Sequence, residues 1–393
     1  MDKRIIYADN AATTKISEKA LAAMLPWYTE NFGNPSSIYG RARTARRGIE
    51  AARETVAKAL GAAKPNEIYF TSGGTESDDW AIKGAAALQT TKKHIVISGI
   101  EHHAISETAH SLERFGFEVT ELPVDSYGLV SVESLEKAMR PDTFLVSIML
   151  ANNEIGTIQP IKELCAAAKA HGALFHTDAV QAVGHIPVDV QDLGVDMLSL
   201  SSHKFHGPQG IGAMYIRSGV RIANLIDGGG QERRRRSGTE NVAAIVGMAT
   251  ALEEQTSDWS RLPKLEALRD RLIKGLLEIP YTQQTGHPTK RLPTNASVVI
   301  NGIEGEGIIL GLDNCGIQAS SGSACTSGSL DPSHVLLGIG LEHAVAHGSL
   351  RLSFGEETTE EDIDYIIAST KQVVERLRSM SPVWDSVNNK PLK

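Results

Sequence analysis

Three short stretches of the sequence carry side chains that could do chemistry together: TSGGTES with Gly73, Gly74 and Thr75, HTDAV with Asp178, and SSHKF with Lys204. Glycines let a ligand approach the backbone, Thr75 offers a hydroxyl, and a helix start offers free N–H groups, so the first stretch could hold a phosphate. A lysine can bond covalently to a carbonyl group, and a carboxylate can keep a ring nitrogen protonated. Together these groups meet the needs of pyridoxal phosphate.

Each stretch also has a simpler interpretation when it is taken alone. TSGGTES could be an ordinary strand-to-helix turn, Asp178 a helix N-cap and Lys204 a solvated loop lysine. The sequence lacks the G-x-x-x-x-G-K-[ST] run of P-loops and the G-x-G-x-x-G fingerprint of dinucleotide-binding proteins. The joint placement of the three stretches favours pyridoxal phosphate over these separate interpretations.

A fourth stretch, SSGSACTSGS from Ser320 to Ser329, places Cys325 among small polar residues with no large apolar neighbour. Such residues bury little and restrict the backbone little, which suits a thiol on a moving loop. Cys165 lies instead in the apolar run KELCAAAKA, and we expect Cys165 and Cys315 to be structural. Three scattered cysteines without a C-x-x-C pair predict neither a disulfide framework nor a metal site.

Alternating strand and helix patterns must position these groups. That alternation is typical of βαβ units and predicts an α/β fold, with a mostly parallel sheet covered by helices on both faces. Ligands bind at the carboxyl ends of such strands, where the first three stretches fall. We expect strands at 67–73, 94–99, 143–150, 173–179 and 195–204, and helices at 76–89, 104–116 and 160–172.

The pattern changes between Thr256 and Pro263, where a long charged helix is followed by short strands punctuated by proline and glycine. This change predicts a smaller second domain of the α+β class. We expect a large cofactor-binding domain at 16–259, and a small domain formed by 1–15 and 260–393. The small domain would carry a mobile loop with the catalytic cysteine at about 318–332.

Composition and charge exclude several partners. The chain has 47 acidic and 39 basic residues and a formal net charge of -8, which argues against a protein that binds the nucleic-acid backbone. The N-terminal MDKRIIYADNAATT has no apolar signal core, and no window approaches the roughly 18 apolar residues of a membrane helix. We expect a cytoplasmic protein with neither a nucleic-acid partner nor a membrane partner.

Ten blocks, in order from Tyr7 to Gly355, resemble the signature blocks of the cysteine desulfurases. They are similar to the NifS/IscS-like branch of the class V, fold-type I pyridoxal-phosphate enzymes, and the lysine block with the SSGSACTSG loop distinguishes this branch from the wider superfamily. The blocks are YADNAATT, FGNPSS, FTSGGTES, EHHA, ANNEIGTIQP, HTDAVQAVG, SLSSHKFHGPQGIGA, GGGQERRRRSGTEN, SSGSACTSG and LRLSFG.

The resemblance implies roles for the residues that match. Lys204 would hold the cofactor covalently, Asp178 would pair with the pyridine nitrogen, Gln181 would lie near the ring hydroxyl, and His102 would stack on the ring and move protons. The cofactor's phosphate would be held by Gly74, Thr75, Ser201, His203 and Thr239, the last from a second subunit of a homodimer. The substrate carboxylate would be bound by Asn153 and Arg351 together with Asn34, and Asn153 would also contact the cofactor.

The resemblance further implies that L-cysteine is converted to L-alanine while its sulfur passes to Cys325 as a persulfide. A sulfur-acceptor or cluster scaffold protein would then receive this sulfur, for iron–sulfur cluster or other sulfur-containing biomolecule synthesis. Selenocysteine lyase, another class V enzyme and a non-catalytic scaffold are the alternatives. The joint retention of Lys204, Asp178, His102 and Cys325 argues against the last of these.

Two stretches depart from the family pattern. Arg233 to Arg236 contains more arginines than the family block, and this run could be a solvated loop or a basic rim near the cofactor phosphate or the dimer seam. Asp78 and Asp79 stand where asparagines are expected, although acidic side chains suit the first turn of a helix.

Overall fold

The structure, a computed structural model, describes residues 5–321, 332–385, 387–388 and 390–392. Its central element is a seven-stranded sheet in the order β2-β8-β7-β6-β5-β3-β4. Neighbouring strands in this sheet are parallel except where β8 pairs with β2 and β7, so the predicted mostly parallel sheet is confirmed. The strands are β2 (Ile68–Thr71), β3 (His94–Ser98), β4 (Glu118–Leu122), β5 (Thr143–Ser147), β6 (Leu174–Asp178), β7 (Met197–Ser201) and β8 (Gly212–Ile216).

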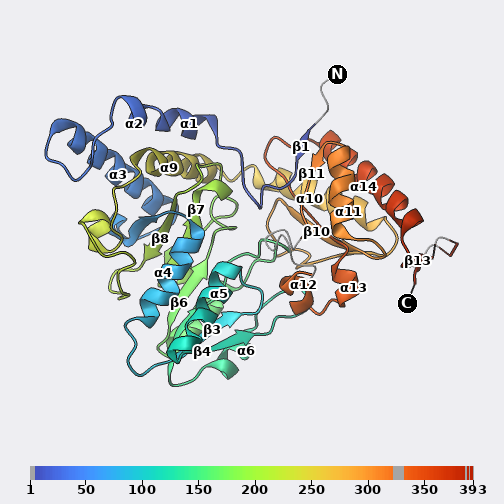
Figure 1. The fold of residues 1–393 in the computed structure, drawn as a ribbon, viewed down its shortest axis with the longest axis horizontal. Helices are drawn as coiled ribbons and strands as arrows, with labels where there is room; N and C mark the ends of the chain where they lie inside the picture. The colour runs from blue at the N-terminus through green and yellow to red at the C-terminus, as the bar shows by residue number, and fades with distance from the viewer. Residues whose placement is uncertain (1–4, 322–331, 386, 389, 393) are drawn as a thin grey trace.

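Helices cover both faces of this sheet, because side chains along a strand alternate between its faces (Figure 1). Tyr69 packs with α4 (Gly74–Ala86) and α5 (His103–Ser111) in one apolar cluster, whereas Ile68 and Phe70 belong to the cluster on the other face. That second cluster includes α1 (Glu18–Met24), α3 (Gly40–Ala59), α6 (Val132–Ala138), α7 (Ile161–Ala170), α8 (Val190–Leu193) and α9 (Val242–Thr256). In the described ranges, no helix is both long and apolar enough to cross a membrane.

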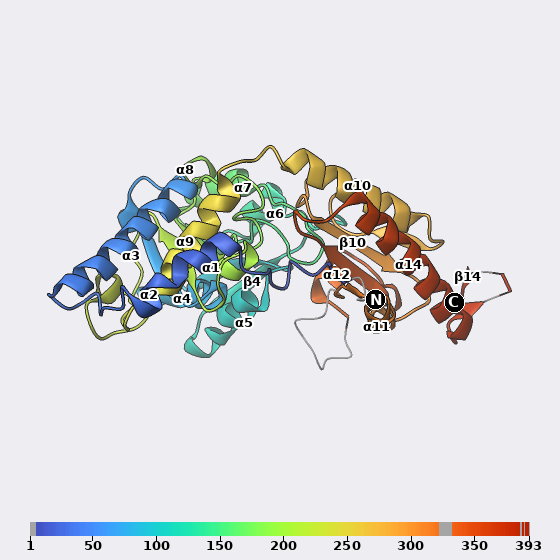
Figure 2. The ribbon, with the colours of Figure 1, turned by 90° about the horizontal axis from the view of Figure 1, so that it is seen from above.

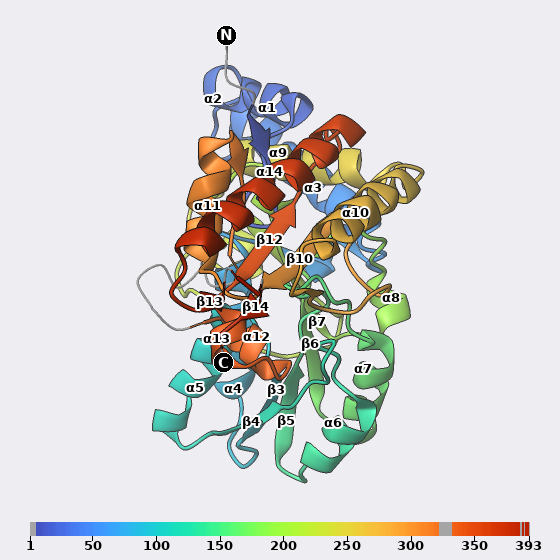
Figure 3. The ribbon, with the colours of Figure 1, turned by 90° about the vertical axis from the view of Figure 1, so that its right-hand side faces the viewer.

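A smaller unit follows α9 and has its own apolar core (Figures 2 and 3). Its antiparallel sheet has the order β12-β10-β9, and Figure 3 shows β10 and β12 among the long helices α10, α11 and α14. A capping box between Thr359 and Asp362 fixes the start of α14. The elements are β9 (Thr282–Gln284), β10 (Asn295–Ile300), β12 (Ser349–Ser353), α10 (Leu262–Leu277), α11 (Gly305–Asn314), α12 (His334–Gly338), α13 (His343–Ala346), α14 (Glu360–Met380), β13 (Trp384–Asp385) and β14 (Lys390–Pro391).

The N-terminal residues join the two units. Strand β1 (Ile6–Tyr7) pairs in parallel with β11 (Ile317–Gln318), and Ile6 packs in the core of the smaller unit. The chain then crosses to α1 and α2 (Pro26–Thr29) beside the large unit (Figure 1). We call the crossing residues 9–14 the N-terminal strap. Its position between the two units places its backbone beside the ends of the central strands.

Candidate active site

Asp178 and Ser201 end the adjacent parallel strands β6 and β7, so both lie at the same edge of the central sheet. Asp178 is buried, and its carboxylate accepts the N–H of Val180 at 2.8 Å. Burial raises the pKa of Asp178, while the Val180 N–H and the positive charge of Lys204 oppose that rise. The charge of Lys204 thus acts on the buried Asp178, as expected for two residues at neighbouring strand ends.

The glycine turn after β2 lies against these strand ends. A Cβ added to Gly74 would lie 2.7 Å from Val180 Cγ2 and 3.6 Å from Ser201 Cβ, so the start of α4 can approach this closely only as glycine. Thr75 follows in the first turn of α4, and its side chain is exposed. The predicted phosphate residues Gly74 and Ser201 are thus neighbours at a helix N-terminus, as an anion site requires.

The N-terminal strap connects the lysine to two other predicted residues. Lys204 Nζ donates to the carbonyls of Ala11 and Ala12, at 2.7 and 2.9 Å. Gln181 Nε2 donates to the same Ala11 carbonyl at 2.9 Å, and His203 Nδ1 lies 3.1 Å from the hydroxyl oxygen of strap residue Thr13. Lys204, Gln181 and His203 therefore all contact the N-terminal strap, although they come from two different loops.

His102 caps the N-terminus of α5, where its Nδ1 accepts the N–H of Ala104 at 3.1 Å. Burial, together with the positive charge of Lys204, lowers the pKa of His102 to about 4. The ring is therefore neutral near pH 7, and because Nδ1 accepts a hydrogen bond, its proton lies on Nε2. The positive charge of Lys204 thus helps to keep the His102 ring neutral.

Arg351 is a buried residue of β12, which belongs to the smaller unit. Its Nη1 donates to the carbonyl of Asn153 at 3.0 Å, and its Nη2 donates to Asp9 Oδ1 at 2.8 Å. The sequence-predicted pair Asn153 and Arg351 is thus in direct contact, across 198 residues of chain. Arg351 also exchanges two backbone hydrogen bonds with Ser320, at 2.7 and 3.2 Å.

Cys325 itself lies outside the described residues, but both described flanks of its segment reach this site. Ser320 pairs with the backbone of Arg351 on one side. On the other side, the hydroxyl of Ser333 donates to Glu154 Oε2 at 2.5 Å, and Glu154 directly follows Asn153. One flank of residues 322–331 therefore contacts Arg351, and the other contacts Glu154, the neighbour of Asn153 in the sequence.

Two predicted residues do not join this group within the chain. Asn34 is exposed in the connection between α2 and α3, where its side chain accepts the N–H of Ser36 at 2.9 Å. In Figure 1, α2 and α3 lie at one end of the molecule, well away from β10. Thr239 is also exposed, in the loop that precedes α9. Substrate binding by Asn34 gains no support from its position in one chain.

The run Arg233 to Arg236 makes specific contacts with the large unit. Arg236 pairs with Glu76 in the first turn of α4, with Nε and Oε1 2.9 Å apart. Glu232, which begins the strained left-handed stretch, receives two hydrogen bonds of 2.8 Å from the buried Arg53. Of the two sequence interpretations, a basic rim near the predicted phosphate site agrees better with these contacts.

Sequence reasoning gave no role to three buried acidic residues near the site, Asp78, Glu101 and Glu154. Burial and the nearby Asp178 raise the pKa of Asp78 well above its usual range, so it is not a solvated first-turn acid. Burial raises the pKa of Glu101 to about 8 and that of Glu154 to about 7. The sequence held one clue to two of them: Glu101 directly precedes His102, and Glu154 directly follows Asn153.

The thiol of Cys165 differs from that of a reactive cysteine. Cys165 is buried in the apolar cluster that includes α7, and burial raises its pKa to about 11. A thiol with so high a pKa is almost entirely protonated near neutral pH and is a poor nucleophile. This environment agrees with the structural role expected for Cys165.

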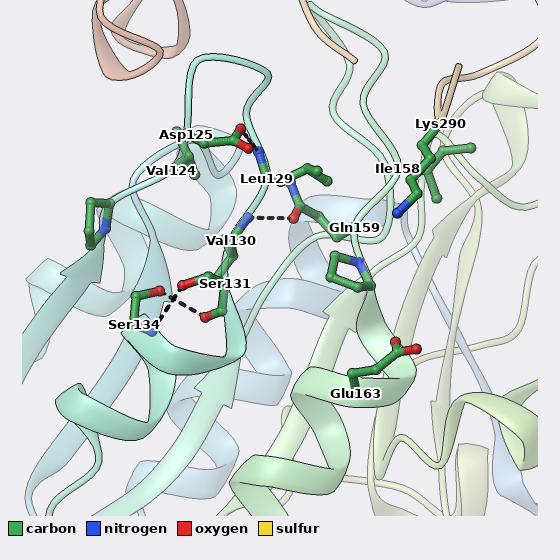
Figure 4. Close-up of a pocket in the computed structure, with 12 residues that line it drawn as sticks. Val124, Asp125, Leu129, Val130, Ser131, Ser134, Ile158, Gln159, Glu163 and Lys290 are labelled. Carbon is green, nitrogen blue, oxygen red and sulfur yellow. Dashed lines mark hydrogen bonds between the residues drawn. The ribbon is translucent and has the colours of Figure 1, made fainter. Parts of the chain in front are cut away.

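A cavity of about 770 Å³ lies apart from the predicted residues, at the starts of α6 and α7 (Figure 4). In Figure 4 the side chain of Gln159 accepts the N–H of Val130, and Ser131 and Ser134 bond to each other. No residue that lines this cavity is among the predicted site residues. We therefore place the candidate active site at the strap and strand ends, where the reactive side chains converge.

The residues at that position fit pyridoxal phosphate. They supply a buried aspartate for a ring nitrogen, a lysine amine held by two carbonyls, and a glycine turn that a Cβ would fill. These are the donor types by which proteins bind this cofactor.

Comparisons with known proteins agree with this site. The family pattern of the class-V aminotransferases matches residues 6–366. Cysteine desulfurase IscS of Methanosarcina thermophila is 56% identical to this chain, over 97% of this chain and 95% of its own length. Cysteine desulfurase NifS of Azotobacter vinelandii is 44% identical, over 96% of this chain and 95% of its own length. A solved NifS-like protein has a TM-score of 0.90 and 41% identity over 95% of this chain and 100% of its own. SspA, solved in complex with cysteine, has a TM-score of 0.80 and 38% identity, over 90% of this chain and 100% of its own. The chain therefore belongs to the class-V aminotransferase family, among the cysteine desulfurases of the IscS and NifS type.

Proposed function

We propose that this protein is a cysteine desulfurase that converts L-cysteine to L-alanine and transfers the sulfur to Cys325 as a persulfide. Pyridoxal phosphate is the cofactor of its family, so the cofactor prediction is confirmed. One observation carries the proposal. The N-terminal strap contacts Lys204, Gln181 and His203 on the large unit and Arg351 on the smaller one. Groups for the cofactor and for an amino-acid carboxylate thus meet at one place.

Pyridoxal phosphate, when bound, supplies an electron sink for charge that develops at the substrate's α-carbon. We assign Lys204 to hold the cofactor and Asp178 to keep its ring nitrogen protonated. Arg351 and Asn153 would orient the substrate by its carboxylate, because a guanidinium presents a planar fork of N–H donors. His102 would present its Nε2 proton toward the reacting groups, because its Nδ1 is already engaged by Ala104.

In the sulfur step, the thiolate of Cys325 attacks the sulfur of the substrate. An S–S bond forms, the bond between Cβ and sulfur breaks, and its electron pair remains on Cβ, which then takes up a proton. The flanks of the Cys325 segment support this assignment, because Ser320 and Ser333 are bonded to Arg351 and Glu154. Neither of the other thiols competes well, since Cys165 is buried and Cys315 lies on the smaller unit's core.

We further propose that the protein is a homodimer that delivers sulfur to an acceptor or cluster scaffold protein. Exposed apolar side chains around α1 to α3 support self-association at that end, including Ile38, which is 90% exposed. A second subunit placed there could bring its Thr239, as the family resemblance implies, to the phosphate site. A cytoplasmic location stays a prediction.

The decisive experiment is intact mass spectrometry of the protein after brief incubation with L-cysteine without reductant, with a parallel assay for L-alanine. We expect one added sulfur, mapped by proteolysis to Cys325, and alanine in equal amount. A protein that holds the cofactor but gains no sulfur and makes no alanine would contradict the proposal. Parallel incubation with selenocysteine distinguishes a selenocysteine lyase, which would release alanine from that substrate alone.

A further inference from the structure

Asp9 is the one carboxylate that contacts the guanidinium of Arg351 in the described part of the chain. Its Oδ1 lies 2.8 Å from Nη2, and the two residues are 342 positions apart. The side chain of Arg351 is 4% exposed and that of Asp9 is 22% exposed, so the pair is largely shielded from water. An ion pair in such an environment is screened little by solvent and holds its geometry well.

The guanidinium is held at two of its three nitrogens. Nη1 donates to the Asn153 carbonyl at 3.0 Å and Nη2 to Asp9, whereas Nε is buried and has no hydrogen-bond partner among the described residues. A buried donor without a partner is rare and unfavourable, and it indicates a group that a ligand can satisfy. The contacts with Asn153 and Asp9 fix the plane of the guanidinium, and they leave further N–H donors of Arg351 for the carboxylate of a ligand.

Asp9 itself is fixed by the backbone around it. Its carbonyl accepts the N–H of Ala12 at 3.0 Å, and Asp9 forms a parallel bridge with Ser353, two residues beyond Arg351. The same strap holds Lys204 through the carbonyls of Ala11 and Ala12. The strap that carries Asp9 therefore contacts both Arg351 of the smaller unit and Lys204 of the large unit.

We propose that Asp9 is a positioning residue that acts through Arg351, holding its guanidinium in the orientation that binds the carboxylate of the amino-acid substrate. This inference rests on the proposed function, in which Arg351 receives that carboxylate. Asp9 does not touch the substrate. It prevents the guanidinium from turning and balances its charge before a substrate arrives.

The test uses two small ligands that differ only in the carboxylate, L-alanine and ethylamine. Their dissociation constants are measured by titrating the absorbance of the cofactor in the holoenzyme. In Asp9→Ala, we expect the Kd of L-alanine to rise about tenfold, as for loss of a hydrogen bond to a charged group, and that of ethylamine to stay within twofold. Asp9→Asn keeps the shape and one acceptor oxygen, so its Kd should rise less than that of Asp9→Ala.

Two comparisons separate positioning from general damage. Asp9→Ala combined with Arg351→Ala should bind L-alanine no more weakly than Arg351→Ala alone, because Asp9 acts through that arginine. Asp364→Asn is the matched control, since Asp364 pairs with Arg271 at 2.7 Å on the exposed surface of α14, and it should change neither Kd.

Equal weakening of both ligands in Asp9→Ala and Asp9→Asn would overturn the inference in favour of a structural role. Tighter binding of L-alanine would also overturn it, because Asp9 would then be a competitor for the guanidinium. If Arg351→Ala leaves the Kd of L-alanine unchanged, the proposed substrate site is wrong. Wild-type protein that makes no alanine from cysteine contradicts the proposed function independently of Asp9.

Discussion

Single residues divide into those that the sequence could predict and those that only packing could identify. The placement of Lys204 and Asp178 at neighbouring strand ends was predictable, because each follows an apolar strand pattern. Asp9 and Glu154 were not assigned, since an acidic residue gains its role here from partners far away in sequence. Asp9 meets Arg351 across 342 residues and Glu154 meets Ser333 across 179. No local pattern reports such contacts.

The residue-scale prediction concerns the thiol that accepts sulfur. Cys325→Ala should retain the cofactor's absorbance and its change on adding cysteine, but lose at least about 99% of sulfide release, because no thiolate is left to take the sulfur. Sulfide release with a thiol reductant and the absorption spectrum measure the two effects.

Cys165→Ala is the matched control for that thiol. Its sulfur is buried and its pKa is raised to about 11, so we expect sulfide release within twofold of wild type and a stability loss of about 1 kcal/mol. Full turnover by Cys325→Ala, or loss of turnover in a folded Cys165→Ala, would show that the wrong cysteine has been assigned.

At the scale of elements, the predicted alternation of strands and helices agrees with β2, β3, β5, β6 and β7 and with α4, α5 and α7. The strands β4 and β8 were not predicted. Residues of β4 are mostly exposed or half-buried at the sheet's edge, so EVTEL lacks an apolar run. Strand β8 is buried but runs antiparallel, outside the βαβ repeat that guided the prediction. The position of the run Arg233 to Arg236 likewise could not be predicted, because it depends on a contact with Glu76, which is distant in the sequence.

The first element-scale prediction tests the glycine turn at the start of α4. A Cβ at residue 74 would lie 2.7 Å from Val180 Cγ2, so Gly74→Ala should push α4 away from the strand ends and weaken the affinity for pyridoxal phosphate about tenfold. Titration of the cofactor-free protein with pyridoxal phosphate measures this change. Gly307→Ala, in α11 with its nearest contact at an ordinary 3.5 Å, should leave the affinity unchanged.

The second element-scale prediction concerns the segment that carries Arg236. Arg53 and Glu232 form a buried ion pair with two contacts of 2.8 Å, and Glu232 also accepts the N–H of Phe70 at 2.9 Å. Glu232→Ala leaves the arginine buried without its partner, so the free energy of unfolding should fall by about 3–5 kcal/mol. Urea denaturation followed by circular dichroism measures the change.

An exposed pair provides the control for that measurement. Asp364 pairs with Arg271, and both side chains are about half exposed, at 54% and 45%. Asp364→Ala should lower the free energy of unfolding by less than about 1 kcal/mol, because water screens an exposed pair. Equal losses in the two variants would mean that the pair between Arg53 and Glu232 does not hold the segment in place.

At the scale of the whole molecule, the apolar clusters support the two-unit division expected from the sequence. Ile6 and Ala8 pack with residues from Leu265 to Val374 in one core, and the central sheet's clusters draw on residues from Ala20 to Leu252, with Leu292 in addition. A further apolar cluster joins Ile100 and Ile155 of the large unit to Val299 and Val335 of the smaller one. The boundaries at 15/16 and 259/260 stay a prediction. The sequence could suggest two units, because strands and helices alternate regularly in the first and not in the second. It could not show that the N-terminal strap would contact residues of both units.

The whole-molecule prediction is a loss of stability toward alkaline pH, caused by buried acidic groups whose pKa is raised by burial. Burial raises the pKa of Glu101 to about 8, well above its unfolded value, so between these values the folded state binds a proton that the unfolded state does not. Stability from this group is therefore complete at acidic pH and is lost as the pH rises through about 8. Between pH 6 and 8, we expect Glu101 to lower the free energy of unfolding by about 2 kcal/mol.

Urea denaturation at both pH values measures the loss. Glu101→Gln keeps a neutral side chain at either pH, so this variant should reduce the loss between pH 6 and pH 8 by about that amount. An unchanged pH dependence in Glu101→Gln would mean that another buried group, with Glu154 the next candidate, carries the effect.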